Sequence, residues 1–199
     1  MWYMRNTETA ALEGMNCIVV GNLADFGPNV SRFRSIWEET HGSSKLELPK
    51  IGLVNHIVIA DTEQEALDAA GPAWDEYIWN LSSPRRIEAE NRGLTQFLKE
   101  LNPRPEGLPD RAADAERYTS NVTKDKYLEK EPGNIGESNK SAGFRAVAGT
   151  PEMICDYLDA YLETEANYFV CAFHFGNMPD EVAQRSIRLF VDKVMPKYV

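Results

Sequence analysis

Apolar residues recur along the chain in two patterns, short continuous runs and stripes with a spacing of three to four positions. Continuous runs rich in aromatic and β-branched residues are typical of strands that are covered on both faces. Stripes at helical spacing are typical of amphipathic helices. The continuous runs predict strands at 1–4, 16–21, 50–60 and 168–173.

The predicted helices alternate with these strands, and several have clear start signals. Thr62 and Glu65 form a capping box, and Thr150 followed by Pro151 combines a capping hydroxyl with a proline at the first helical position. This alternation is typical of an α/β fold with a parallel sheet. Helices are expected at 7–13, 28–41, 62–78, 84–101, 151–162 and 179–194.

The expected fold class is α/β, a partial (β/α)8 TIM barrel formed by about the last four βα units, in a single domain that spans 1–199. A complete barrel needs roughly 250 residues, and this chain has 199. Residues 82–147, rich in Pro, Gly and charge, are predicted to be a helical and irregular insertion before the last strand. Their composition also suits a disordered linker. Open sheet edges and an uncovered inner face favour association, so we expect a homo-oligomer.

Composition and charge exclude several functions. The formal net charge is −10 and the pI about 4.9, which disfavours binding to a phosphate backbone, so no nucleic acid partner is expected. The sequence has no run of 18 apolar residues and no signal-peptide pattern, so we expect neither a membrane partner nor secretion. Three cysteines without CxxC spacing suit reduced thiols in a cytoplasmic protein.

The last quarter of the chain resembles the C-terminal end of the luciferase-like flavin monooxygenases, which fold as TIM barrels and include bacterial luciferase. The resemblance lies in GTPE at 149–152, YFVCAFHFGNMP at 168–179 and VMP at 194–196, and WYM, CIVVG and GLVNHIVIADTEQEA continue it upstream. It implies that the chain supplies the fifth to eighth strands and lacks the N-terminal half.

The same resemblance implies an enzyme in which reduced FMN and O2 oxidise a small organic substrate, with a flavin reductase as a further partner. A deazaflavin-dependent oxidoreductase on the same fold is an alternative. Another is a non-catalytic flavin-binding or partner subunit.

By position in the family, the FMN phosphate would be bound at the turn after the first strand, by Asn6, Thr7 and Thr9, with Arg5 as a charge partner. Free amides at a helix N-terminus attract a phosphate. An ordinary helix cap is an equally open interpretation of the same residues.

His174 lies at the C-terminal end of the last predicted strand, where barrels place their chemistry, and is the candidate catalytic residue. Phe173 and Phe175 flank it, and Phe173, His174 and Phe175 together would form a substrate pocket. A histidine that only hydrogen-bonds a loop is the alternative. His56 is interpreted as structural, and His41 as a favourable charge at a helix C-terminus. Three scattered histidines predict no metal site.

Overall fold

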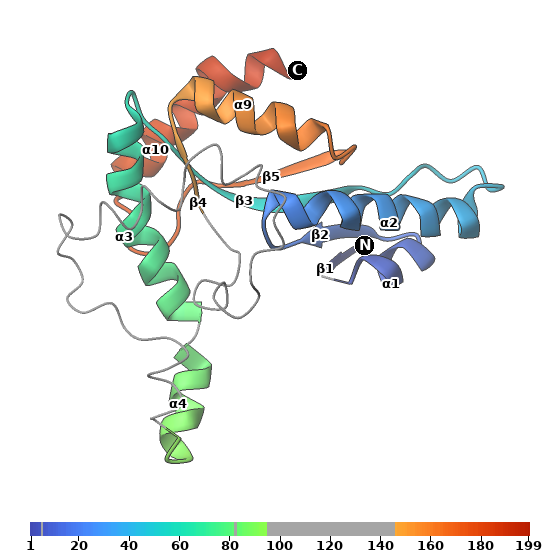
Figure 1. Cartoon of the computed structure of the whole chain (residues 1–199), viewed down its shortest axis with the longest axis horizontal. Coiled ribbons are helices and arrows are strands. Elements are labelled where there is room, and N and C mark those ends of the chain that lie inside the picture. The colour runs from blue at the N-terminus through green and yellow to red at the C-terminus, as the bar shows by residue number, and fades with distance from the viewer. Residues whose placement is uncertain (5, 82, 95–145) are drawn as a thin grey trace.

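A computed structural model describes residues 1–4, 6–81, 83–94 and 146–199 (Figure 1). Strands and helices alternate along the described chain, as the sequence predicts. The strands are β1 (Trp2–Met4), β2 (Asn16–Val19), β3 (Ile51–Ile59), β4 (Ala146–Gly149) and β5 (Tyr168–Ala172). The α-helices are α1 (Thr7–Leu12), α2 (Leu23–His41), α3 (Glu63–Leu81), α4 (Ser83–Asn91), α9 (Pro151–Leu162) and α10 (Asp180–Leu189).

All strand pairs in the described sheet are parallel, which confirms the predicted α/β class. The central strand β3 pairs through Ile51–Leu53 with β2 and through His56–Ile59 with β4. β5 pairs with residues 52–56 of β3, overlapping both of these segments. Since a strand has two edges, β2 and β4 follow one another along one edge of β3, and β5 occupies the other.

The strand β4 was not predicted from the sequence, which indicated four strands, whereas the described residues form five. Its four residues are small, Ala-Val-Ala-Gly, and the first two lie inside the region 82–147 that was predicted to be an insertion. All four are buried. Pairing with β3 stabilises this strand. A run of four residues is too short for its periodicity to predict a strand from the sequence.

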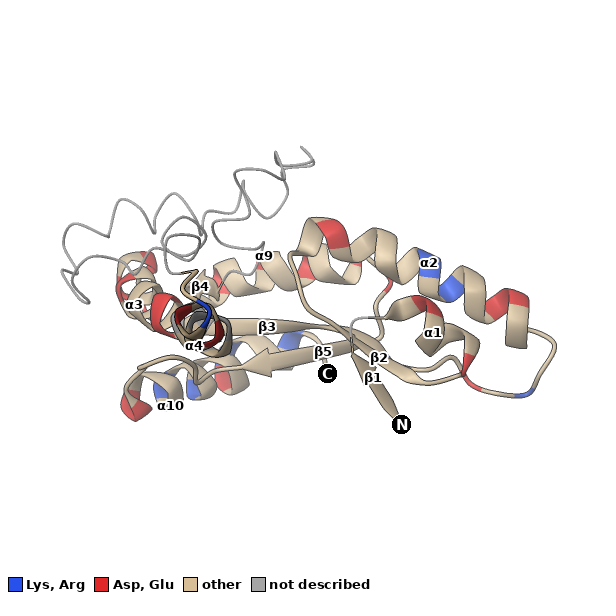
Figure 2. Cartoon of the chain, turned by 90° about the horizontal axis from the view of Figure 1, so that it is seen from below, with Lys and Arg blue, Asp and Glu red and all other residues tan. Residues whose placement is uncertain are grey.

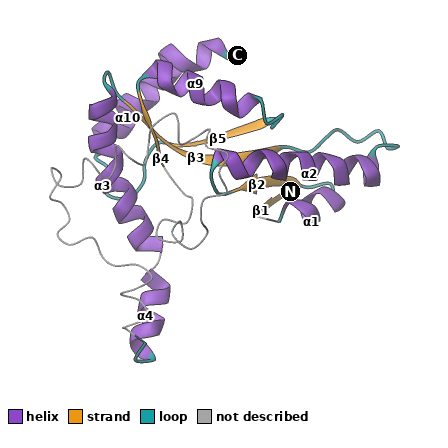
Figure 3. Cartoon of the chain, in the orientation of Figure 1, coloured by secondary structure: helices purple, strands orange, loops and turns teal. Residues whose placement is uncertain are grey.

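The two faces of the sheet differ in how they are covered. Side chains alternate between faces along a strand, and register partners on neighbouring strands share a face. Residues such as Cys17, Leu53 and Ile57 therefore form the outer face, which packs against α1, α2 and α9 (Figure 3). The alternate positions form the inner face, where α3 covers Val58 and Ala148 at the C-terminal end.

The inner face is concave. Trp2 of β1 and Tyr168 of β5 have ring centroids 4.9 Å apart, although β2 and β3 lie between their strands. In a flat sheet, three strand spacings would separate these backbones by roughly 14 Å. Gly52 of β3 allows the backbone of Tyr168 to lie close to it, because a Cβ at position 52 would be 2.5 Å from the Tyr168 carbonyl oxygen. The sheet is therefore curled as in a segment of a barrel.

Towards the start of β1 the inner face is open among the described residues. Trp2 exposes 45 % and Met4 64 % of its surface. The expectation that the strand at 168–173 is buried on both faces was wrong, because every residue of β5 is half-buried. Its inner side faces the concave surface, and β3 alone pairs with it in the described sheet.

Two helix boundaries differ from the prediction. α2 begins at Leu23, five residues before the predicted start at Pro28, because the Asn22 side chain accepts the N–H of Asp25 at 2.8 Å and caps the helix. Pro28 is accommodated inside it. The predicted last helix ends as an α-helix at Leu189 and continues as a π-helical turn, Phe190–Val194, and a 3-10 turn, Met195–Lys197.

The predicted capping sites of α3 and α9 are confirmed. Thr62 Oγ1 accepts the N–H of Glu65 at 3.2 Å, and Thr150 Oγ1 accepts the N–H of Met153 at 3.5 Å. The helix predicted at 84–101 is seen as α4, which ends at Asn91 and is followed by a turn at 92–93. Residues 95–101, with most of the predicted insertion at 82–147, lie outside the described residues. No helix in the described ranges is long and apolar enough to cross a membrane.

Candidate functional site

Parallel strands bring their C-terminal ends to one edge of the sheet, and the loops there are the usual place for a site in α/β folds. In this chain the strand ends are staggered, because β2 ends opposite Leu53 and β5 opposite His56, whereas β3 continues to Ile59. The sequence-predicted residues Asn6, Thr7 and Thr9 follow β1, and Phe173, His174 and Phe175 follow β5. Arg5 lies outside the described residues.

The turn after β1 is built as a helix cap. Asn6 is the N-cap residue of α1, and its Oδ1 accepts the N–H of Thr9 at 3.0 Å. Thr7 is buried, with 7 % of its surface exposed. A phosphate at this turn would compete with Asn6 for the Thr9 amide and would meet little of the Thr7 hydroxyl. Glu8 in the same turn pairs with Arg32 of α2 at 3.2 Å. Phosphate binding by these residues stays a prediction.

The structure separates the three residues predicted to flank the end of β5. His174 is exposed, and its Nε2 lies 3.1 Å from Asp180 Oδ1 at the start of α10. Phe173 packs on the helical side, with its ring 5.4 Å from that of Phe190. Phe175 is 4 % exposed and packs with α3 on the inner face. Their roles in catalysis or substrate binding remain predictions.

His56, which the sequence suggested to be structural, lies at the centre of an aromatic cluster on the inner face. Its ring centroid is 5.2 Å from that of Trp74, 4.6 Å from Tyr77 and 5.1 Å from Phe175. The residue exposes 6 % of its surface, and burial lowers the pKa of His56 to about 4. The imidazole is therefore neutral near pH 7. Trp74 and Tyr77 lie three positions apart on α3, and this helical spacing was the sequence signal that both belong to one face of the helix.

The loop after β5 is fixed against α3. Gly176 has a φ of 59°, and a Cβ at this position would lie 1.8 Å from the carbonyl oxygen of Ala73. This close approach needs glycine, and it sets the neighbouring Phe175 against Trp74 and His56.

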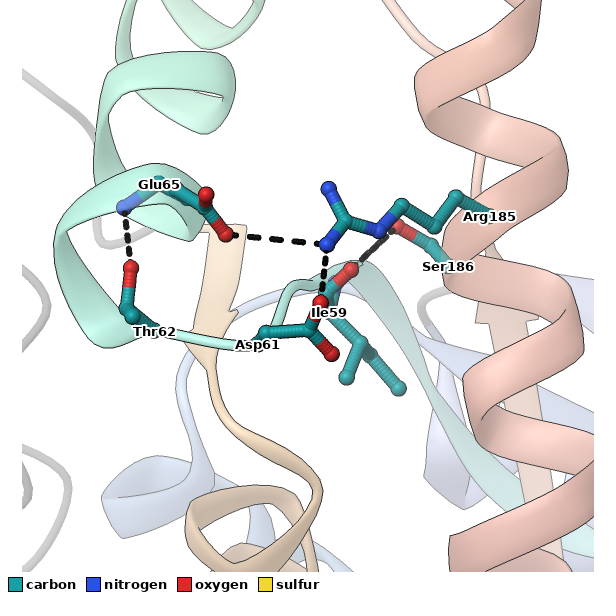
Figure 4. A network of polar contacts seen from close by, with 6 residues as sticks. All are labelled: Ile59, Asp61, Thr62, Glu65, Arg185 and Ser186. Carbon is teal, nitrogen blue, oxygen red and sulfur yellow. Dashed lines mark hydrogen bonds and ion pairs between the residues drawn. The ribbon is translucent and has the colours of Figure 1, made fainter.

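A polar network fixes α10 to the end of β3 (Figure 4). Arg185 pairs with Asp61 and lies 3.7 Å from Glu65 Oε2. Ser186 Oγ accepts the N–H of Ile59 at 3.0 Å and donates to its carbonyl at 3.2 Å. These backbone groups lie beyond the last β5 pairing, at His56, so the serine satisfies an edge that β5 leaves free.

The sheet that forms the inner face is uncharged. The five strands that the structure describes contain no Lys, Arg, Asp or Glu, and Figure 2 shows the charged residues on helices and loops. In the described ranges no group of three or more His, Cys, Asp and Glu could hold a metal ion. The arrangement therefore offers an apolar, concave surface with a neutral imidazole at its C-terminal end.

Thiolate chemistry is disfavoured at the cysteines of the sheet. Burial raises the pKa of Cys17 to about 11 and that of Cys171 to about 12. Both thiols thus stay protonated at neutral pH, and a protonated thiol is a weak nucleophile. All three cysteines are free, as the sequence predicted.

No protein-family model matches the sequence, and no curated protein matches it at the level of sequence. Solved structures match the fold. Monooxygenase RslO1 from Streptomyces bottropensis is 16% identical, with a TM-score of 0.53, and the match covers 100% of this chain and 48% of that one. The coenzyme F420-dependent tetrahydromethanopterin reductase of Methanopyrus kandleri is 16% identical, with a TM-score of 0.59, and the match covers 100% of this chain and 50% of that one.

The oxygenating constituent of 3,6-diketocamphane monooxygenase from Pseudomonas putida, a structure in complex with FMN, is 12% identical. Its TM-score is 0.51, with coverage of 100% of this chain and 48% of that one. The neighbours are luciferase-like TIM-barrel enzymes, flavin- or F420-dependent, and the likeness is one of fold. The chain spans about half the length of each of these structures. The predicted partial barrel is thus confirmed as a fold class.

Proposed function

We propose that this chain forms part of a luciferase-like flavin-dependent monooxygenase, in which reduced FMN and O2 oxidise a small organic substrate. The observation that carries the proposal is the concave, uncharged inner face of a parallel sheet, which α3 covers at the C-terminal end and which is open towards β1 among the described residues. The fold shared with flavin- and F420-dependent oxidoreductases supports the cofactor class.

The inner face suits a flat ring better than the turn after β1 suits a phosphate. Met4, Ile18, Val54 and Val170 share the inner face by register, and each is at least partly exposed. An aromatic ring system lying on these side chains would bury apolar area on both partners. The phosphate end is assigned to the turn at 5–9, where Asn6 would have to release the Thr9 amide.

The division of labour follows from these contacts. A bound reduced flavin supplies the electrons with which O2 is activated. The residues of this chain bind the ring, orient the substrate and exclude water at the end of the sheet covered by α3 and Phe175. His174 is retained as the candidate acid or base at the rim, paired with Asp180.

A second candidate is a flavin-binding or partner subunit without turnover of its own. It is favoured by the exposed side chains of Trp2 and Met4 and by the unpaired outer edges of β1 and β5 within the described sheet. Self-association through this face fits both candidates, and sedimentation of the purified chain measures it.

A flavin titration tests the proposal. FMN is added to the protein and binding is followed by quenching of flavin fluorescence, with a deazaflavin as competitor. We expect saturable binding of FMN, weakened about tenfold in Thr9→Ala and Thr7→Ala if these residues contact the phosphate. Thr40→Ala, at the exposed C-terminal end of α2, is the matched control and should leave the affinity unchanged. Absence of FMN and deazaflavin binding would remove the proposal.

Turnover separates the two candidates. The chain is mixed with photoreduced FMN, isotopically labelled O2 and an organic ketone, and products are analysed by mass spectrometry. One labelled oxygen atom in an organic product supports the enzyme. Flavin binding with no labelled product favours the partner subunit.

A further inference from the structure

His56 is enclosed by aromatic rings and still has hydrogen-bonding capacity to offer. In the described part of the chain, no hydrogen bond reaches either nitrogen of its ring. Trp37 Nε1 is the only fully buried side-chain nitrogen or oxygen without a partner among the described residues. The His56 nitrogens are therefore not fully buried, although the residue as a whole exposes only 6 % of its surface.

An unpartnered imidazole at such a depth is costly unless something pairs with it, because a buried polar group without a hydrogen bond is destabilising. The ring gains nothing by becoming charged, since its ring neighbours Trp74, Tyr77 and Phe175 offer no carboxylate to pair with an imidazolium. A neutral imidazole offers one N–H donor and one acceptor.

The position of His56 makes this capacity accessible from the inner face. His56 shares that face with Val54 on its own strand and with Ala172 on β5, its register partner. Val54 and Ala172 are only half-buried. A molecule lying on the apolar inner face can thus reach the His56 ring from the side of Val54 and Ala172, while α3 and Phe175 close the other side of the ring.

We propose that His56 is the recognition residue for an uncharged, flat ligand that lies on the inner face and accepts or donates one hydrogen bond through a carbonyl or hydroxyl oxygen. The apolar side chains of Val54 and Ala172 would contact its body, and the rings of Trp74, Tyr77 and Phe175 hold the imidazole from the closed side. The absence of ionised groups in this cluster selects against a carboxylate or an ammonium ligand. The assignment of this ligand as the oxidised substrate rests on the proposed function.

The three histidines of this chain allow a direct test. Protein labelled with nitrogen-15 in histidine is titrated with acetophenone, and the ring nitrogen signals are followed by NMR. His56→Phe assigns the signal of His56, and His41→Gln, whose ring contacts Leu12 far from the cluster, assigns that of His41. Styrene, which lacks the oxygen, and benzoate, which is charged, are the comparison probes.

We expect acetophenone to shift the His56 signal saturably and to bind about three- to tenfold more tightly than styrene, with benzoate weaker than both. His56→Phe keeps an aromatic ring and removes both nitrogens, so acetophenone should lose this advantage over styrene. Equal affinities for acetophenone and styrene in the unmodified protein, or no shift of the His56 signal, would overturn the proposal even if the variant fails to fold.

A parallel FMN titration on the same sample keeps the two claims apart. A shift of His56 by acetophenone without FMN binding supports the site and removes the flavin function. FMN binding without a shift of the His56 signal by acetophenone supports the flavin function and removes the proposed His56 site.

Discussion

The hydroxyl of Tyr161 provides a sharp test of how the sheet is held together. Tyr161 lies on α9, is 2 % exposed, and its hydroxyl accepts the N–H of Leu53 at 2.9 Å and donates to the carbonyl of Tyr168 at 2.6 Å. In an uninterrupted parallel ladder these two backbone groups, of β3 and β5, would bond to each other. The Tyr161 hydroxyl is therefore inserted between β3 and β5 and replaces one direct backbone hydrogen bond between them.

Tyr161→Phe removes one atom and leaves a buried N–H and a buried C=O without partners. Each such group costs about 1–3 kcal/mol, so we expect a loss of about 3 kcal/mol in the free energy of unfolding. For a chain of this size the loss corresponds to a fall in Tm of about 6–12 °C. Urea unfolding followed by circular dichroism measures it, with a lower midpoint and an unchanged slope.

Tyr198→Phe is the matched control. The Tyr198 hydroxyl also makes two bonds, to the Cys155 carbonyl at 2.9 Å and to Asp159 at 2.8 Å, but it lies near the surface, where water can replace it. We expect it to cost less than about 1 kcal/mol. If Tyr161→Phe destabilised no more than this control, the strands would have closed on each other, and the argument for an inserted hydroxyl would be refuted.

Two further predictions concern the aromatic cluster and its support. The pKa of His56 falls from its ordinary 6.5 to about 4 on folding, so the unfolded chain binds more protons than the folded chain between these pH values. The resulting contribution to the free energy of unfolding is about 3 kcal/mol at most. It is present above pH 6.5 and is lost as the pH falls to 4. His56→Phe should flatten the pH dependence of unfolding in this window, and an unchanged slope would contradict the assignment. Gly176→Ala should cost more than about 2 kcal/mol in thermal unfolding, because its Cβ meets the Ala73 carbonyl, whereas Gly93→Ala, with a φ of 68° and open space, should cost only about 1 kcal/mol. Equal losses for the two glycines would show that the loop is not seated on α3.

Local signals were sufficient where the chemistry is local. Thr62 with Glu65, and Thr150 with Pro151, start their helices as predicted, because a capping side chain and the amide it satisfies lie within one turn. The continuous apolar run of β3 likewise identified the central strand. At Pro28, by contrast, the prediction of a helix start is wrong, because the Asn22 cap begins the helix upstream and Pro28 lies inside it.

The candidate site was less accessible from the sequence because distant segments form it. His56, Trp74 and Phe175 come from β3, α3 and the loop after β5, and their contact depends on how α3 crosses the sheet. Phe173 and Phe175 were predicted as one pocket, but the chain leaves the strand after Ala172, so one ring turns to the helical layer and the other to the inner face. Strand periodicity cannot predict side-chain direction past the end of a strand.

The location of a bound flavin tests the central claim most directly, and hydroxyl-radical footprinting of the chain at saturating FMN measures it. Met4 on the inner face and Met195 in the C-terminal 3-10 turn expose 64 % and 40 % of their surfaces, so both are open to oxidation in the free protein. We expect FMN to protect Met4 several-fold and to leave Met195 unchanged. Protection of Met195, or an unprotected Met4 at saturation, would contradict the central claim.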